Sequence, residues 1–230
     1  MLEPGSKAQR RSRAVGVAAA LLLAVGSGAA LGTGFEPPLP LGELIDVSDA
    51  VLVGTITGVS ASTFTFRVSE VVRGRIPGPS IEVDKFPAPE TSPRWAPYCT
   101  GQSVLLFLAA GRASGGGRGP FHILGRIGEG EIPLDERYAY FHSRYVSFLE
   151  ADHHRIHDRT VYIQRFDRAT TIAAISAYPP CLEWREAERA GRRRAKVACS
   201  ASELAAYRAR SPLHEFLVGE AEQSAGGPRS

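Results

Sequence analysis

The chain has 230 residues, of which 43% are hydrophobic and 22% are charged, a balance that is typical of a folded globular protein and not of a disordered one. Four of the 27 basic residues and one of the 24 acidic residues lie within residues 1–33, so the rest of the chain is formally neutral despite the overall charge of +3. This balance gives no electrostatic reason to expect nucleic acid as a partner.

The N-terminus has the pattern of a secretory signal peptide. Arg10, Arg11 and Arg13 form a positive region, residues 14–31 are apolar, and small residues near the end of this run offer a cleavage site. We expect a signal peptide over residues 1–33 and an exported protein, periplasmic or extracellular. The alternative is an uncleaved anchor, because an apolar run of about 18 residues is just long enough to cross a bilayer. A membrane would be a partner only in that second case.

Short strands separated by turns are expected after this segment. Residues 34–45 are proline-rich and predict a linker, and residues 43–50 could form a short helical turn. Residues 50–74 predict a β-hairpin, because Phe64 and Phe66 alternate with polar residues after a β-branched run. Further strands are expected at residues 80–86, 102–109, 121–126 and 129–134. The continuous apolar character of the 102–109 segment predicts a strand that is buried on both faces.

The C-terminal half changes in character and predicts mainly helices. One more strand is expected at residues 161–166. Helices are expected at residues 168–178 after an Asp167 cap, at 182–196, at 200–210 after a Ser200 or Ser202 cap, and from Pro212 to Val218.

Together these patterns predict an α+β fold. A small antiparallel OB-like β-barrel would occupy residues 46–136, with Gly54 and Gly58 letting its first strand coil. A mixed, mostly helical C-terminal part would follow over residues 137–222, and a disordered tail over residues 223–230. We expect a group of aromatic residues to fasten the C-terminal part onto the barrel, with a ligand groove as the alternative. They are Tyr138, Tyr140, Phe141, Tyr145 and Phe148.

The three cysteines predict one disulfide, because an exported chain meets an oxidising compartment. Cys181 and Cys199 flank a 17-residue segment, and pairing them would leave Cys99 free. Pairing Cys99 with either of the others would instead tie the C-terminal part to the barrel. The local pair, Cys181 with Cys199, is the pairing we predict, and the long-range pairs are the alternative.

Three segments resemble, in their order along the chain, a known domain family. They are Ser48–Ile56, Phe66–Gly74 and Cys99–Phe107. This arrangement, over roughly residues 46–132, resembles the netrin-like domain shared with tissue inhibitors of metalloproteinases and with exported bacterial proteins of similar layout. The resemblance implies an OB-type five-stranded barrel. It does not imply the inhibitory mechanism, because the inhibitors use an N-terminal cysteine and no cysteine precedes Cys99 here.

The histidine-rich segment 152–158 is the strongest candidate for a metal-binding or catalytic site. Imidazoles bind zinc or copper, and a helix would place His153 and His157 on one face. The helical zinc motif, however, needs a glutamate after its first histidine, where this chain has His154. A solvated polar turn is the simpler interpretation, so we expect neither a metal nor another cofactor.

Two acidic residues, Glu129 and Glu131, alternate on a predicted strand and could carry out acid–base chemistry. Carboxylates on the solvent face of a barrel edge are the simpler interpretation. The sequence therefore favours an exported, non-catalytic binding or interaction module with an unknown protein or small-molecule partner. The alternatives are a metal-binding protein or metal-dependent enzyme that uses His153, His154 and His157, and a membrane-tethered envelope protein.

Overall fold

The structure is a computed structural model that describes residues 38–87, 94–111, 119–126, 128–142, 145–186 and 193–226. These residues all belong to one structural unit, residues 36–230. The predicted signal peptide, residues 34–37 of the predicted linker and residues 227–230 of the predicted tail lie outside the described residues.

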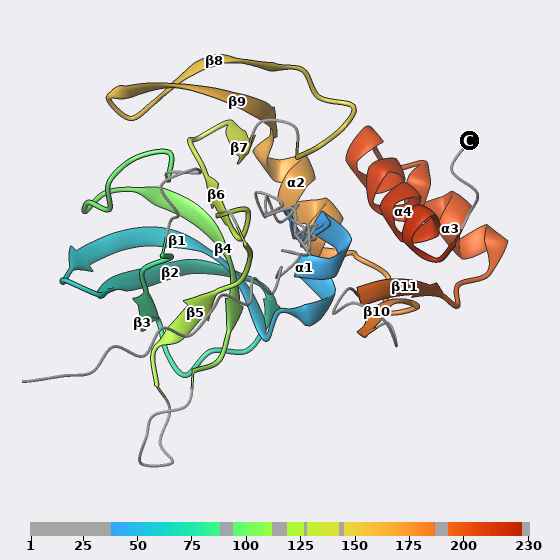
Figure 1. Ribbon diagram of the computed structural model, residues 1–230, viewed down its shortest axis with the longest axis horizontal. Coiled ribbons are helices and arrows are strands. Elements are labelled where there is room, and N and C mark those ends of the chain that lie inside the picture. The colour runs from blue at the N-terminus through green and yellow to red at the C-terminus, as the bar shows by residue number, and fades with distance from the viewer. Residues whose placement is uncertain are drawn as a thin grey trace, which may run out of the picture. The chain divides into compact units, whose positions relative to one another are not determined.

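Five strands close into a β-barrel (Figure 1). In order around the ring they are β1 (Ala50–Val59), β2 (Thr63–Gly74), β3 (Ser80–Asp84), β5 (Phe121–Ile123) and β4 (Ser103–Ala109). Pairing of β1 with β4, from Ala50 opposite Leu108 to Thr55 opposite Ser103, closes the ring. A further strand, β6 (Glu131–Pro133), also pairs with β4. The predicted β-barrel is therefore confirmed.

One pair of neighbouring strands differs from the predicted antiparallel arrangement. Strands β3 and β5 run parallel, with Val83 opposite Phe121 and Asp84 opposite His122. Strand direction cannot alternate all the way around a closed ring of five strands, so at least one parallel pair is a geometric necessity.

The barrel strands separate two hydrophobic cores. Leu52, Ile56, Phe64, Phe66 and Leu106 fill the barrel interior, and each is at most 1% exposed. The intervening residues of β1 and β4 point outward and are buried in a second core, namely Val51, Val53, Leu105 and Phe107. Strand β4 is thus buried on both faces, as its apolar run predicts.

Gly54 allows strands β1 and β2 to approach each other closely. A Cβ atom there would lie 2.2 Å from the Arg67 carbonyl oxygen, so β2 can approach this closely only because the residue is glycine. The register between β1 and β2 shifts beside Gly54 and at two other points. Such irregularities increase the twist of a strand and help a small sheet to close.

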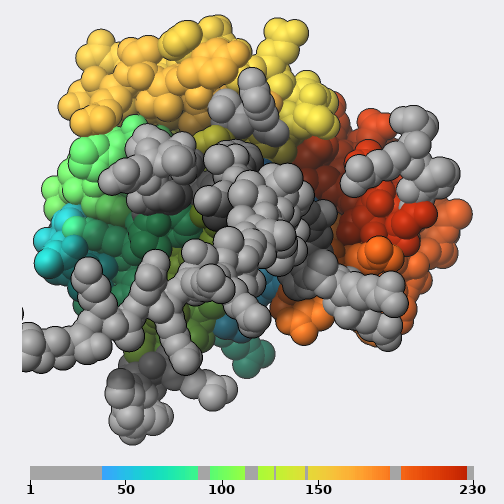
Figure 2. Space-filling model, viewed as in Figure 1, coloured from blue at the N-terminus to red at the C-terminus, as the bar shows by residue number. Residues whose placement is uncertain are grey.

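The C-terminal part adds a three-stranded sheet and three helices among its described residues. The sheet has the order β7 (Tyr138–His142), β9 (Arg159–Asp167), β8 (Ala151–Ile156). The helices are α2 (Arg168–Ser176), α3 (Ala201–Arg208) and α4 (Pro212–Ser224). Figure 2 shows the β8–β9 hairpin, in gold, over the barrel. Tyr140, Ile156 and Ile163 of this sheet are buried, and Trp95 from the segment before β4 packs against them. The aromatic segment thus helps to fasten the C-terminal part to the barrel.

The predicted helix over residues 182–196 is wrong. The segment contains a hairpin of β10 (Leu182–Glu186) and β11 (Arg193–Val197). Leu182 and Trp184 are buried while the residues between and after them are more exposed, which is the two-residue period of a strand. Because β7, β8 and this hairpin were not predicted, the expectation of a mostly helical C-terminal part holds only in part.

The predicted linker is also wrong from Leu41 onward, because these residues form the buried helix α1 (Leu41–Val47). Leu41 and Leu44 are fully buried, and Ile45 is 1% exposed. Burial of each such side chain contributes about 1.5–3 kcal/mol. The helical turn expected from residue 43 is present, although it begins two residues earlier and ends at Val47.

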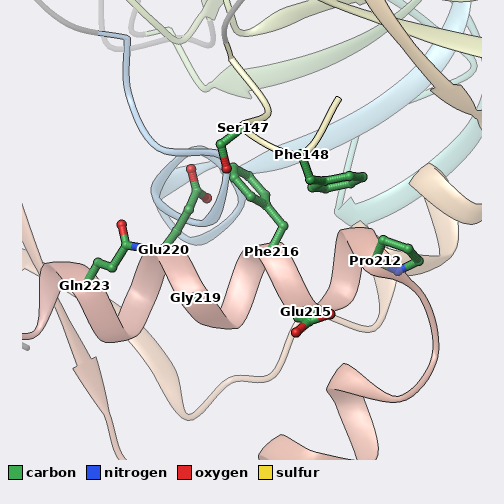
Figure 3. Close-up of a pocket in the computed structure, with 8 residues that line it drawn as sticks. All are labelled: Ser147, Phe148, Pro212, Glu215, Phe216, Gly219, Glu220 and Gln223. Atoms are coloured by element: carbon green, nitrogen blue, oxygen red, sulfur yellow. The ribbon is translucent and has the colours of Figure 1, made fainter. Parts of the chain in front are cut away.

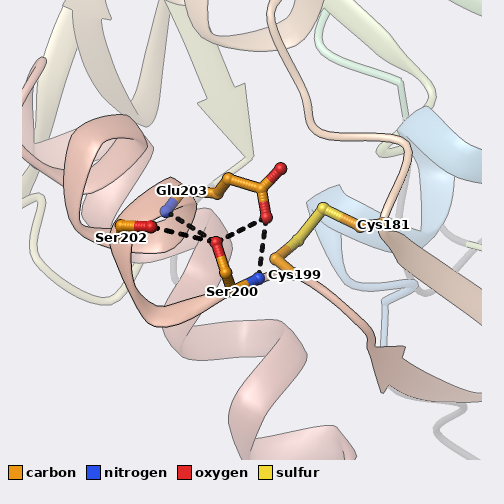
Figure 4. The surroundings of a disulfide bond; sticks show 5 residues. All are labelled: Cys181, Cys199, Ser200, Ser202 and Glu203. Carbon is orange, nitrogen blue, oxygen red and sulfur yellow. Dashed lines mark hydrogen bonds between the residues drawn. A yellow bond between two sulfur atoms is a disulfide. The ribbon is translucent and has the colours of Figure 1, made fainter.

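Predicted caps begin the later helices. The Asp167 carboxylate accepts a hydrogen bond from the Thr170 N–H, and Ser200 forms a capping box with Glu203. Pro212 is the first residue of α4, which continues through residues 223 and 224 of the predicted tail. The disulfide joins Cys181 to Cys199, with their Cα atoms 5.1 Å apart, immediately before the Ser200 cap (Figure 4). The predicted pairing is confirmed, and Cys99 is free and exposed.

Candidate functional site

The three candidate metal ligands do not converge. His153 and His154 are consecutive on strand β8, so their side chains point to opposite faces of the sheet, and His157 lies in the following turn with φ 54°. Each ring lies against a different aromatic residue, with ring centroids 5.1 Å apart for His153 and Tyr162, 5.9 Å for His154 and Tyr140, and 5.7 Å for His157 and Trp95. Within the described part of the chain, no three His, Cys, Asp or Glu side chains form a group that could hold a metal ion.

The expected solvent-facing position of Glu129 and Glu131 is wrong, because these side chains are buried. Glu131 forms an ion pair with Arg94, whose side chain is only 9% exposed, and accepts a hydrogen bond from the Tyr98 hydroxyl at 3.2 Å. The Glu129 carboxylate accepts hydrogen bonds from the Leu39 N–H at 2.8 Å and the Arg126 N–H at 2.9 Å. Both carboxylates therefore attach neighbouring segments to the barrel.

Aromatic rings and amide groups complete the site around Arg94. Its guanidinium lies 3.8 Å from the centre of the Tyr98 ring and 4.5 Å from that of Trp95. It also donates to the Gln102 side-chain oxygen at 2.9 Å. Burial, and then the nearby Glu131 charge, raise the pKa of Tyr98. These contacts connect the segment before β4 to Glu131 of β6, so the network helps to hold that segment in place.

The best candidate for a binding site is a pocket of about 290 Å³ beside helix α4 (Figure 3). One stripe of α4 is buried in the second core and includes Leu213, Leu217 and Ala221. The adjacent stripe lines the pocket, together with two residues of the segment that precedes β8. The lining residues are Ser147, Phe148, Pro212, Glu215, Phe216, Gly219, Glu220 and Gln223.

Phe148 and Phe216 form the apolar wall of this pocket. Their ring centroids are 5.7 Å apart with an interplanar angle of 62°, and Phe148 also makes an edge-to-face contact with Phe166. Such pairs are worth about 0.5–1.5 kcal/mol beyond the area that they bury. Phe148 is nevertheless 39% exposed, so it offers surface to a ligand.

Glu220 supplies a carboxyl group to the same pocket. It is half-buried, and it accepts hydrogen bonds from the Leu41 N–H at 3.3 Å and the Gly42 N–H at 3.1 Å, at the start of α1. Burial raises the pKa of Glu220 to about 8, against the opposing effect of these two hydrogen bonds, and the nearby Glu43 raises it further. A carboxyl group with a strongly shifted pKa in a concave site is a candidate for function.

Gly219 leaves the floor of the pocket open. A Cβ atom at this position would meet nothing within 4 Å, so packing does not require glycine here. In Figure 3, Phe216 and Glu220 extend from α4 toward the segment that carries Ser147 and Phe148. Neither Phe216 nor Glu220 is predicted from the sequence as a site residue; their i, i+4 spacing beside a helical glycine is the signal that could have indicated them.

A second pocket of about 330 Å³ lies at one end of the barrel, and its described lining includes one aromatic residue, Phe121. It is lined by Asp49, Arg75, Ile76, Pro77, Ala110, Gly111, Gly119 and Phe121. The Asp49 carboxylate there already accepts a hydrogen bond from the Ala110 N–H at 2.8 Å.

In comparisons with known proteins, no family model matches the chain, and no curated protein or solved structure matches it at a significant level. None of the helices in the described residues combines the length and the apolar character needed to span a bilayer.

Proposed function

We propose that this protein is an exported, non-catalytic binding module that holds a small amphipathic molecule in the pocket beside α4. The observation that carries the proposal is the combination of Phe148, Phe216 and Glu220 in one recess of about 290 Å³. Ligand sites in proteins usually combine apolar walls with a few polar groups that fix orientation. The contact of α4 with α1, through Glu220, places this pocket on elements anchored in the second core.

We also propose that the barrel is OB-like and related to netrin-like domains. Its closed ring of five strands agrees with the strand number of that fold. In this proposal the barrel is a scaffold, and the C-terminal part that packs on it supplies the binding site.

Export is part of the proposal, and two observations support it. The disulfide between Cys181 and Cys199 is typical of proteins that fold in oxidising compartments. The first 33 residues have the composition of a signal peptide. The membrane-tethered form remains the alternative, which N-terminal sequencing of exported material would distinguish.

The metal-binding alternative gains no support from the geometry, because His153, His154 and His157 each lie against a different aromatic ring. Metal analysis of the purified protein tests it directly. Stoichiometric zinc or copper that is lost in a variant with all three histidines replaced by alanine would overturn the proposed function.

Binding of a small aromatic probe tests the proposed pocket. We expect benzyl alcohol, added to the purified protein, to cause saturable shifts in the amide NMR signals of residues around Phe148 and Phe216. The Gly219→Leu variant should lose these shifts, because its side chain would fill the open space above residue 219. Equal shifts in this variant, with a well-dispersed spectrum, would show that the probe binds elsewhere and would contradict the proposal.

A further inference from the structure

We infer that the pocket beside α4 selects an organic cation, specifically a primary amine carried on an apolar group. This inference rests on the proposed function of the pocket as a ligand site, and it names the class of ligand. It follows from three features of the described residues: the charges that line the pocket, the position of its carboxyl group, and its aromatic wall.

The charged residues that line the pocket are both acidic. They are Glu215, which is exposed, and Glu220, which is half-buried, and the described lining includes no lysine, arginine or histidine. Two basic residues act on the neighbouring Glu43, namely Arg193, which lies 4.0 Å from that carboxylate, and Arg126, and neither is among the residues that line the pocket. An anionic ligand would therefore meet two acidic groups and no basic one among the described lining residues, whereas an ammonium group would be complementary to Glu215 and to the ionised form of Glu220.

Glu220 is placed to act as the counter-ion of such a ligand. Its two oxygens accept the Leu41 and Gly42 N–H groups, which fixes the carboxyl group at the wall of the pocket. Among the described residues, no cationic side chain forms an ion pair with Glu220. A half-buried carboxylate without a counter-ion is costly, so the charge of a bound ammonium group would offset part of that cost.

The aromatic wall suits the rest of the ligand. Phe148 and Phe216 line the pocket together with the Glu220 carboxyl group. Figure 3 shows Phe216 and Glu220 extending from α4 in the same direction. A cation near aromatic faces gains about 0.5–2 kcal/mol, and an apolar group attached to it is removed from water by the same rings. A simple metal ion or a fully polar cation would not use this wall.

Three probes of the same shape test the charge preference: benzylamine, benzyl alcohol and benzoate. Each is titrated into the purified protein at about pH 8.5, where Glu220 is largely ionised and benzylamine is still mostly protonated, and followed by amide NMR. We expect benzylamine to bind about 5–10-fold more tightly than benzyl alcohol, and benzoate to bind more weakly than either. The Glu220→Gln variant should lose most of this preference for the amine, with a small remainder due to Glu215, while its affinity for the alcohol stays within about twofold.

A matched control removes a carboxylate from the same helix but outside the pocket. Glu222 is exposed and forms an ion pair with Arg208, so Glu222→Gln should leave the preference for the amine unchanged. Equal binding of amine and alcohol by the native protein, or an unchanged preference in Glu220→Gln, would overturn the cation inference while the pocket remained a binding site. If none of the three probes bound, both the inference and the proposed function would be overturned.

Discussion

Two opposing effects act on the pKa of a single residue, Glu220. The Leu41 and Gly42 N–H groups favour its ionised form, whereas burial favours the neutral form and is the stronger effect, raising its pKa to about 8. Glu43, whose own pKa is also raised mainly by burial, adds to the second effect. An acidic residue at this position therefore destabilises the folded protein at alkaline pH. Residues that serve binding often lower stability in this way.

We predict that Glu220→Gln makes the protein more stable at alkaline pH. Because the pKa of Glu220 is about 8 in the folded protein and near 4.5 in the unfolded chain, folding favours the protonated form. The contribution of Glu220 to the free energy of unfolding is fully present below about pH 4.5 and is lost as the pH rises through about 8. The variant should exceed the native protein by on the order of 2 kcal/mol in free energy of unfolding near pH 9, with little difference near pH 4.

Urea denaturation at both pH values checks this expectation, and Glu215→Gln is the control because Glu215 is exposed on the same helix. The comparison is made between variant and native protein at each pH, because carboxyl groups with lowered pKa, such as that of Asp135, add a pH dependence of the opposite sign. If Glu220→Gln and the native protein were equally stable near pH 9, the prediction would be contradicted.

Gly219→Ala should stabilise the protein even though it lies in the candidate pocket. Glycine inside a helix costs about 0.8–1 kcal/mol relative to alanine, and the added Cβ atom meets nothing within 4 Å. Chemical denaturation should show a gain of about 0.5–1 kcal/mol without a change in slope. A loss of stability would mean that the space above residue 219 is filled.

Individual elements differ in how well the sequence predicts them. The hairpin of β1 and β2 was predicted because Phe64 and Phe66 alternate with polar residues, and α2 because Asp167 can cap it. These signals are local. A helix is predicted over the segment of β10 and β11 because charged residues conceal the alternation of buried side chains, which are Leu182 and Trp184 in β10 and Ala195 in β11.

The candidate site depends on contacts between segments that are distant in the sequence, which explains why it was not predicted. Glu220 lies 179 residues from Leu41, whose N–H it accepts, and Glu131 lies 37 residues from its partner Arg94. Sequence spacing predicts the alternation of Glu129 and Glu131 on a strand, but it does not reveal that a distant arginine covers one of them. The pairing of Cys181 with Cys199 was predictable because the two residues are close in the sequence.

The buried ion pair between Arg94 and Glu131 should tolerate removal of both charges better than removal of one. Glu131→Leu alone leaves the Arg94 guanidinium buried without its carboxylate, which we expect to cost about 3–5 kcal/mol in free energy of unfolding. Adding Arg94→Met should recover at least about 2 kcal/mol, because the uncompensated charge is then removed. A double-mutant cycle by urea denaturation measures this coupling.

The surroundings of the pair allow a control for this cycle. Gln102 receives a hydrogen bond from Arg94 but carries no charge, so Gln102→Leu should couple more weakly to Glu131→Leu than Arg94→Met does. Additive effects of Arg94→Met and Glu131→Leu would mean that the two charges are separately solvated.

At the scale of the whole molecule, strands β1 and β4 link the barrel to the C-terminal part because both of their faces are buried. Their inner face belongs to the barrel interior, and their outer face joins the core that contains α1 and α4. A ligand pocket lined by α4 is therefore supported by the barrel through continuous packing. The first described residue that packs against this second core is Leu39.

We expect the Cys181–Cys199 disulfide to form when the protein is exported and to be absent when the protein stays in the cytoplasm. When the chain is produced in a bacterium with its N-terminal segment intact, we expect an exported product that begins near residues 31–34 and has one free thiol, that of Cys99. The chain produced in the cytoplasm without residues 1–33 should have three free thiols, because the cytosol keeps Cys181 and Cys199 reduced. Intact mass and thiol titration in denaturant distinguish these products. An exported product that retained residues 1–33 would favour the membrane anchor, and one with three thiols would contradict the link between this fold and an oxidising compartment.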